Sequence, residues 1–200
     1  GYIGLEMAEN LTEKGISVTI VQRPNQVMAP LDYDMACQLH GLLRKKGITL
    51  KFGSSVTGFE EKDGLILTTL KDDEPLKSDL VILAIGVTPD TALAKDAGLA
   101  LGIKGSITVN ERMETSAPDV YAVGDAVQVK NFVTGEDALI SLAGPANKQG
   151  RIAADNICGL KSSYDGSQGS SVIKIFDMTA ATTGINEKTA KQLGIDYDKV

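Results

Sequence analysis

The amino-acid sequence predicts an α/β fold, and two observations carry this prediction. Over the first 52 residues, helical apolar periodicity alternates with short strand-like runs, which favours helices packed on a sheet of parallel strands. From Val56 to Gly86, three strand-like runs follow one another with only turn-forming residues between them, which is typical of a β-meander. Together the two patterns predict a Rossmann-like unit that carries a β-meander insertion.

The alternating part contains two predicted helices and two predicted strands. Leu5, Ala8 and Leu11 share one face of the first helix. The second helix ends in lysines and a glycine, which favour a helix C-terminus. We expect its apolar stripe to consist of Met35, Leu39, Leu42 and Leu43. In order along the chain, the predicted elements are helix 4–14, buried strand 17–22, helix 30–47 and strand 48–53.

The meander and the rest of the chain are predicted from shorter patterns. The three meander strands are expected at 56–61, 64–70 and 79–86, separated by the turn-forming stretches "KDG" and "KDDEP". The remaining predicted elements are helix-and-turn material at 88–105, a strand at 121–127 that ends in Gly-Asp, a turn and helix within 141–159, a strand at 172–178 and a helix at 186–194.

Composition and charge limit the partners that the chain is expected to have. A net charge of -6 and a pI near 4.9 argue against a general nucleic-acid binder, which needs a basic face. No apolar stretch approaches the roughly 18 residues that a membrane span requires, so we expect no membrane partner. The chain begins without Met and within a motif, which predicts that it is a piece of a longer polypeptide.

The two cysteines, Cys37 and Cys158, lie far apart and form no CxxC pattern. They predict neither a metal site nor a disulfide framework, and a cytoplasmic location is expected. We expect both to be small buried apolar side chains. The single histidine, His40, lies three positions from Cys37. A Cys–His pair is one interpretation, and a histidine on the helix surface is the commoner one.

Gly1 and Gly4 open the first helix in a G-x-x-G pattern. The free N–H groups and the dipole at a helix N-terminus favour an anion, so a pyrophosphate site is one interpretation. Gly1 would let the backbone approach the phosphates, and Gly4 would let the helix pack closely on its strand. A tight turn without a ligand is the alternative, and this pattern alone does not decide between them.

Gln22 and Arg23 stand at the end of the strand that follows, where a nicotinamide cofactor is selected. An acidic residue there would bind the ribose hydroxyls of NAD(H), whereas an arginine accommodates the 2′-phosphate of NADP(H). This chain has no carboxylate at the position and a cation beside it. A phosphate contact and a solvated loop residue are both compatible with Arg23.

Gly124 and Asp125 end the strand predicted at 121–127. A carboxylate at the carboxyl edge of a sheet lies where open α/β folds bind ligands, and it accepts hydrogen bonds from sugar-like hydroxyls. The same side chain could equally cap the next helix.

Five stretches of the sequence carry a specific resemblance. "GYIGLEMAENL", "VILAIGVTPDT", "TSAPDVYAVGDAV", "LAGPANKQGRIAADNICG" and "FDMTAATTG" occur in the order seen in FAD-dependent pyridine nucleotide-disulphide oxidoreductases. The chain most closely resembles the CoA-disulphide reductase and NADH oxidase branch, over essentially all of its 200 residues. "TSAPDVYAVGDA" is the most specific stretch.

The resemblance implies a division into three domains and two cofactors, FAD and NAD(P)H. Residues 1–86 would form the NAD(P)H-binding domain without its first strand, 87–163 the returning half of an FAD-binding domain, and 164–200 the start of an α+β dimerisation domain. The whole protein would be a homodimer that passes hydride from NAD(P)H through the flavin to a small-molecule disulphide such as CoA disulphide, or to a persulphide. An NADH oxidase that reduces oxygen and a non-catalytic redox sensor are the alternatives, and the chain alone is expected to be inactive.

Several residue roles follow from the resemblance. Tyr2 matches a tyrosine that lies over the flavin, Glu6 an acid near the nicotinamide carboxamide, and Asp125 an acid that holds the ribityl chain. The alternatives are a half-buried aromatic at the helix start for Tyr2 and a first-turn glutamate favoured by the helix dipole for Glu6. Residues 142–144 match a turn beside the isoalloxazine, and 84–86 a stretch that passes close to the nicotinamide. The candidate cofactor-binding residues are Gly1, Tyr2, Ile3, Gly4, Glu6, Gln22, Arg23, Ala84, Gly86, Gly124, Asp125, Leu142, Ala143 and Gly144.

The chain also departs from the pattern of the family. Gln22 replaces the common acid, which leaves NADH or NADPH preference open, and Thr88 stands where close relatives often show arginine. The redox-active cysteine of the branch is expected before Gly1, because neither Cys37 nor Cys158 matches it. No catalytic residue and no metal ligand are therefore expected within these 200 residues.

Overall fold

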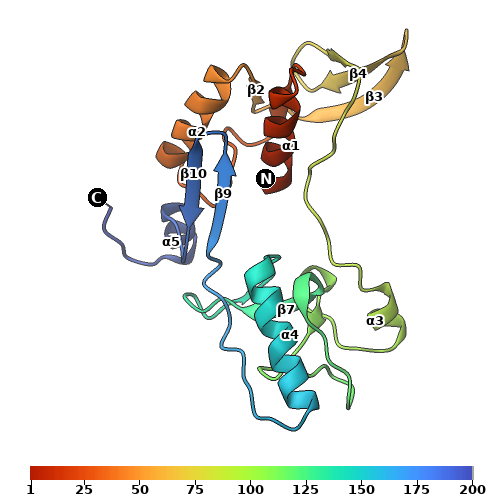
Figure 1. Ribbon diagram of the computed structural model, residues 1–200, viewed down its shortest axis with the longest axis vertical. Coiled ribbons are helices and arrows are strands. Elements are labelled where there is room, and N and C mark those ends of the chain that lie inside the picture. Colours follow the sequence, from red (N-terminus) through yellow and green to blue (C-terminus); the bar gives the residue numbers. More distant parts are fainter. Residues whose placement is uncertain (200) are drawn as a thin grey trace. The chain divides into compact units, whose positions relative to one another are not determined.

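The computed structural model describes residues 1–199 and has a mixed α/β fold, as predicted (Figure 1). Val200, the last residue of the domain predicted at 164–200, lies outside the described residues. The chain divides into two compact units. The first comprises 1–86, 172–180 and 186–200, and the second comprises 87–171 and 181–185.

The first unit begins with two helices and a pair of parallel strands. These are α1 (Tyr2–Glu13), β1 (Thr19–Gln22), α2 (Tyr33–Lys45) and β2 (Thr49–Phe52). β1 and β2 pair in parallel from Thr19 opposite Thr49 to Gln22 opposite Phe52. Parallel neighbours need a crossover connection, and α2 supplies it. The predicted alternation of helix and strand is therefore confirmed.

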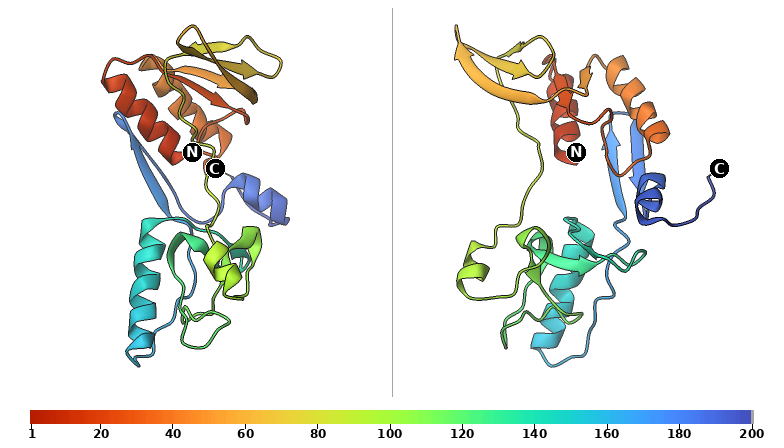
Figure 2. Two further views of the ribbon diagram at one scale, coloured as in Figure 1. Left: turned by 90° about the vertical axis from the view of Figure 1, so that its right-hand side faces the viewer. Right: turned by 180° about the vertical axis from the view of Figure 1, so that it is seen from behind.

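The meander of the first unit consists of β3 (Val56–Lys62), β4 (Leu65–Leu70) and β5 (Leu76–Ser78) in antiparallel order (Figures 1 and 2). The strand predicted at 79–86 is wrong. That segment has irregular backbone, and its exposed apolar side chains include Leu83, at 63% exposed, and Ile85, at 88%. A strand needs a hydrogen-bonded neighbour, and no strand within residues 1–199 pairs with this segment.

Two strands and a helix from the end of the chain complete the first unit. They are β9 (Ser171–Ile175), β10 (Met178–Thr182) and α5 (Glu187–Leu193). The single strand predicted at 172–178 is thus wrong in extent, because Phe176 and Asp177 form a turn between two paired strands. Gly194 ends α5 with a left-handed φ of 64°, which glycine adopts without steric cost.

The core of the first unit joins the N-terminal helices to this hairpin. Its buried apolar residues are Leu5, Ala8, Val27, Met28, Leu31, Ala36, Leu39, Leu43, Ile48, Ile173, Ile175 and Phe176. Burial of a large apolar side chain of this kind contributes about 1.5–3 kcal/mol. The hairpin is therefore part of this core and not an appendage.

The buried face of α2 is displaced from the predicted stripe. Ala36, Leu39, His40 and Leu43 are buried, in an i, i+3, i+4, i+7 pattern, whereas Met35 is 60% exposed. The prediction of Met35 as a core residue and the expectation of His40 on the helix surface are both wrong. A helix turns 100° per residue, so a shift of one position moved the histidine into the core.

The second unit contains α3 (Ala92–Asp96), η1 (Ile103–Gly105), β6 (Ile107–Thr108), η2 (Gly124–Ala126), β7 (Val127–Lys130), β8 (Asp137–Ala138) and α4 (Ala143–Ile157). β7 is the central strand, parallel to β6 and antiparallel to β8. The core consists of Met113, Val127, Val129, Ile152, Ala153 and Tyr164. The strand predicted at 121–127 is wrong in extent, because Gly124 has a φ of 86° and the strand begins only at Val127.

Candidate nucleotide-binding sites

The start of α1 has the features of an anion-binding helix terminus. Gly1 is the N-cap and makes no side-chain cap hydrogen bond. Tyr2 is half-buried and packs against the core of the first unit, while Ile3 and Glu6 are exposed. The carboxylate of Glu6 is open to solvent.

Gly4 lies against the segment that carries Ala84 and Gly86. A Cβ atom added at Gly4 would lie 3.2 Å from the Cβ of Ala84, which is tighter than an ordinary van der Waals contact. Gly86, two positions further on, has a φ of 103°, a conformation that side chains rarely adopt. The structure therefore brings together two of the predicted residues, Gly4 of α1 and Ala84.

Gln22 and Arg23 lie at the carboxyl end of β1. Gln22 is half-buried and pairs with Phe52, and Arg23 is exposed. Its guanidinium group makes no hydrogen bond or ion pair with any residue in the described range 1–199. The next residue, Pro24, is held beside the end of β2, because the N–H of Gly53 donates to its carbonyl at 3.4 Å. The cation is thus available to an anionic group at this edge of the strand pair.

Gly124 and Asp125 are connected to α4 in the second unit. The N–H of Gly124 donates to Oε1 of Gln149 at 2.7 Å, and Gln149 is only 1% exposed. Asp125 lies in the short helix η2 with its side chain exposed. The N-cap of α4 is Leu142, so Asp125 does not cap that helix. The carboxylate of Asp125 remains available as an acceptor of hydrogen bonds.

Leu142, Ala143 and Gly144 form the start of α4. Leu142 has extended backbone and supplies no side-chain cap, and its carbonyl accepts the N–H of Ala146 at 3.1 Å. Ala143 and Gly144 are exposed. The positive end of a helix of 15 residues therefore faces solvent without a side-chain acceptor.

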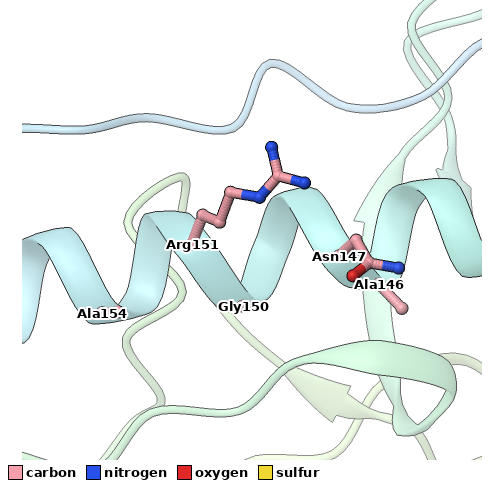
Figure 3. A pocket seen from close by; sticks show the side chains of 5 residues that line it. All are labelled: Ala146, Asn147, Gly150, Arg151 and Ala154. Atoms are coloured by element: carbon pink, nitrogen blue, oxygen red, sulfur yellow. The ribbon is translucent and has the colours of Figure 1, made fainter.

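An open depression lies along one face of α4, lined by Ala146, Asn147, Gly150, Arg151 and Ala154 (Figure 3). All five residues belong to this one helix. None of the candidate cofactor-binding residues lines the depression, so it is a separate feature of the helix surface.

The cysteines give a mixed outcome. Cys37 is half-buried, but Cys158 is exposed, so the expectation of a buried Cys158 is wrong; it follows the last turn of α4, where the chain leaves the core. Both thiols are free. Within residues 1–199, no group of three or more His, Cys, Asp or Glu side chains could hold a metal ion. No helix in the same range has the length and apolar character needed to cross a membrane.

Sequence reasoning missed three polar residues that support these sites. They are Gln149 beneath Gly124, and His40 and Lys188 around the loop after Arg23. The i, i+3, i+4, i+7 spacing could have identified His40 as buried. Lys188 had no local signal, because its partners lie far away in the sequence.

Comparison with known proteins gives a consistent result. NAD(P)H sulfur oxidoreductase (CoA-dependent) from Pyrococcus abyssi is 36% identical over 197 residues, covering 98% of this chain and 44% of that protein. The chain thus spans less than half the length of this curated relative.

Two solved structures are similar over nearly the whole chain. Reduced CoADR-RHD from Bacillus anthracis has a TM-score of 0.95 and 50% identity, covering 99% of this chain and 35% of that one. Water-forming NADH oxidase from Lactobacillus brevis bound to NADH has a TM-score of 0.91 and 32% identity, covering 98% of this chain and 43% of that one. The family described as pyridine nucleotide-disulphide oxidoreductase matches residues 1–150. With three quarters of its length matched, the chain belongs to the pyridine nucleotide-disulphide oxidoreductase family.

Proposed function

We propose that this chain is the nicotinamide-binding and flavin-contacting part of an enzyme that passes hydride from NAD(P)H, through FAD, to a disulphide such as CoA disulphide or to a persulphide. One observation carries the proposal: α1 and α4 both begin without a side-chain cap, at the positions that the family resemblance gives to nicotinamide cofactor and flavin. The helices α2 and α3 also begin without a side-chain cap, so the place of α1 and α4 in the family's motifs is what distinguishes them. Within residues 1–199, α5 is the α-helix that has a side-chain cap, from Asn186, which accepts the N–H of Thr189. The positive end of a helix without a side-chain cap favours anionic groups of a ligand.

At the nicotinamide side, the chain supplies backbone donors and a cation. The N–H groups at the start of α1 bind the pyrophosphate, and Gly4 permits the close approach of the 84–86 segment. Arg23 binds a 2′-phosphate, and Gln22 offers an uncharged amide to the ribose. This set of donors fits NADPH as well as NADH, since no carboxylate opposes the phosphate at residues 22 and 23.

At the flavin side, the chain supplies an acceptor and a helix dipole. Asp125 accepts hydrogen bonds from the ribityl hydroxyls, and Gly124 is held beside it by Gln149. The start of α4, at residues 142–144, stabilises negative charge at the ring, an effect worth about 0.3–1 kcal/mol at an exposed helix end. When bound, FAD supplies the two-electron chemistry that these side chains cannot perform.

The remaining parts of the proposal concern the whole protein. Residues 1–86 form the NAD(P)H-binding domain, 87–163 the returning half of the FAD-binding domain and 164–200 the beginning of a dimerisation domain. The protein acts as a cytoplasmic homodimer, and its redox-active cysteine lies outside these 200 residues. The similarity to the CoA-dependent sulfur oxidoreductase supports a sulfur-containing acceptor.

A second candidate function is reduction of oxygen. The similarity to a water-forming NADH oxidase favours it. Turnover by the purified full-length protein separates the candidates. With NADPH or NADH as donor, we expect faster turnover with CoA disulphide or a persulphide than with oxygen alone. Oxygen as the preferred acceptor would establish the oxidase instead, and a protein that binds cofactors but turns over with no acceptor would be a sensor.

A further inference from the structure

The loop that follows Arg23 is unusually well buried for a surface connection. Gln26, Val27 and Met28 are 7%, 2% and 2% exposed. Met28 has a φ of 52°, a left-handed conformation that costs a non-glycine residue energy. Buried backbone groups need partners, so the contacts of this loop identify what holds it.

Two side chains from α5 and its N-cap hold three consecutive carbonyl groups of the loop. The ammonium group of Lys188 donates to the carbonyls of Ala29 and Leu31, at 2.8 Å each. The amide of Asn186 donates to the carbonyl of Pro30 at 3.0 Å. Hydrogen bonds from a charged donor are stronger than those from a neutral donor.

His40 and Gln26 hold the other side of the loop. Nε2 of His40 accepts the N–H of Val27 at 3.2 Å, and the ring packs on Phe52 with centroids 4.6 Å apart. The side-chain amide of Gln26 donates to the carbonyl of Leu31 at 3.0 Å. We call residues 26–31 the β1–α2 loop. It is held by His40 of α2, by Lys188 of α5 and by its own residue Gln26.

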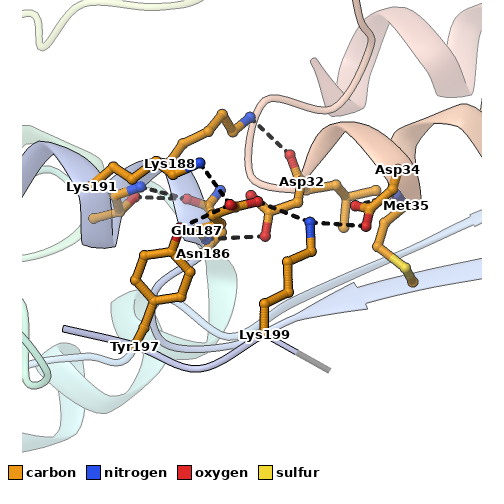
Figure 4. Close-up of polar contacts among 11 residues, drawn as sticks. Asp32, Asp34, Met35, Asn186, Glu187, Lys188, Lys191, Tyr197 and Lys199 are labelled. Atoms are coloured by element: carbon orange, nitrogen blue, oxygen red, sulfur yellow. Dashed lines mark hydrogen bonds and ion pairs between the residues drawn. The ribbon is translucent and has the colours of Figure 1, made fainter. Parts of the chain in front are cut away.

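Helix α5 is itself held in a defined place (Figure 4). Oδ2 of Asp32 accepts the N–H of Glu187 at 3.0 Å. The carboxylate of Glu187 accepts hydrogen bonds from Lys191, Lys199 and Tyr197, and these lower its pKa to about 2. Lys188 thus projects from an ordered helix terminus, so its contacts with the loop are pre-organised.

We infer that Lys188 is a positioning residue for cofactor specificity, which it exerts by fixing the β1–α2 loop and hence the place of Arg23. The inference rests on the proposed role of Arg23 as the partner of a 2′-phosphate. Arg23, Pro24 and Asn25 are exposed and lie between Gln22 in β1 and the buried Gln26. The carbonyl of Pro24 accepts one hydrogen bond, from the N–H of Gly53 at 3.4 Å, and the remaining support of this stretch comes from the β1–α2 loop. A side chain that is ordered before binding loses less conformational entropy when it meets its ligand.

The direct test uses binding to the full-length, FAD-loaded protein, measured by calorimetry. The probes are adenosine 2′,5′-bisphosphate, which carries the 2′-phosphate, and adenosine 5′-monophosphate, which lacks it. We expect Lys188→Met to weaken binding of the bisphosphate about tenfold, because a loop that is no longer held leaves Arg23 to be ordered at the expense of binding. Binding of the monophosphate is expected to change less than about twofold.

Lys14→Met is the matched control. Lys14 is an exposed lysine at the end of α1 in the same unit, and it belongs to none of the contacts that hold the β1–α2 loop or α5. We expect this variant to bind both probes as the wild type does. Lys188→Arg, which keeps a cation with several donors, is expected to retain most of the preference for the bisphosphate and also serves if Lys188→Met does not fold.

A double-mutant cycle with Arg23→Ala separates positioning from a merely structural role. If Lys188 acts through Arg23, Lys188→Met will change bisphosphate binding little once Arg23 is absent. Additive effects of the two substitutions, or an equal loss of affinity for both probes, would overturn the inference. A wild-type protein that binds both probes equally would also overturn it, and this result would leave hydride transfer from NADH untouched.

Discussion

Oε1 of Gln149 accepts the N–H of Gly124 at 2.7 Å, from a side chain that is 1% exposed. This contact joins the middle of α4 to the short helix that carries Asp125, and it is the structural link between two of the predicted flavin-contacting stretches. Replacing its acceptor is therefore expected to affect both stability and flavin retention.

Gln149→Met keeps the volume of the side chain but leaves the N–H of Gly124 without its acceptor. We expect the free energy of unfolding to fall by about 1–3 kcal/mol, the cost of an unsatisfied buried donor. In the full-length protein, the FAD content after purification should also decrease. Urea denaturation and flavin absorbance measure the two effects. Lys148→Met, at the exposed neighbouring position, should change neither, and equal losses in both variants would contradict the role of Gln149.

Gly4 and Gly41 form a matched pair of helical glycines. A Cβ atom at Gly4 would lie 3.2 Å from the Cβ of Ala84, whereas one at Gly41 would meet nothing within 4 Å. Gly41→Ala should therefore raise the free energy of unfolding by up to about 1 kcal/mol, and Gly4→Ala should not show this gain. Gly4→Val in the full-length enzyme should increase KM for NAD(P)H several-fold, because the 84–86 segment has to move. An unchanged KM for this variant would show that the 84–86 segment does not lie at the cofactor site.

His40 should give the protein a pH-dependent stability. Burial, and then the charge of Arg44, lower the pKa of His40 below its usual value of 6.5. The unfolded chain therefore binds more protons than the folded protein below that pH, so stability is full above about pH 6.5 and falls as the pH decreases. His40→Gln, measured by denaturation between about pH 5 and 8, should lack this slope. The same slope in wild type and variant would assign the titration to another group.

Gln22 stands where an acid would bind the ribose hydroxyls. Gln22→Glu should shift the full-length enzyme towards NADH, since a carboxylate accepts from both hydroxyls and repels a 2′-phosphate. The ratio of kcat/KM for the two cofactors measures the shift. The same ratio in wild type and variant would show that residue 22 does not face the ribose.

Elements with a strong local pattern could be predicted from the sequence. The helices around Leu5 and Leu39 and the parallel strands β1 and β2 follow from apolar periodicity and from the glycines that end them. Residues 79–86 could not be predicted correctly, because a run of apolar residues becomes a strand only when a neighbouring strand pairs with it. Here the irregular segment leaves Ile85 88% exposed.

The candidate site was predictable only in part, for a related reason. Glycines at helix starts carry a local signal, so Gly1 and Gly4 could be selected from the sequence. The residues that hold these segments in place could not be selected from the sequence, because they act through contacts between distant parts of the chain. Lys188 reaches the carbonyls of Ala29 and Leu31, and no periodicity links these positions.

The central claim is that this chain helps to bring nicotinamide cofactor to a bound flavin. Its most direct test is an anaerobic titration of the purified full-length protein with NADPH, and separately with NADH, while the visible absorbance of the flavin is followed. We expect a flavin-loaded protein whose absorbance is bleached by about one equivalent of reduced cofactor, because hydride transfer moves two electrons at once. A protein that holds no flavin, or whose flavin stays oxidised in excess of both cofactors, would contradict the account.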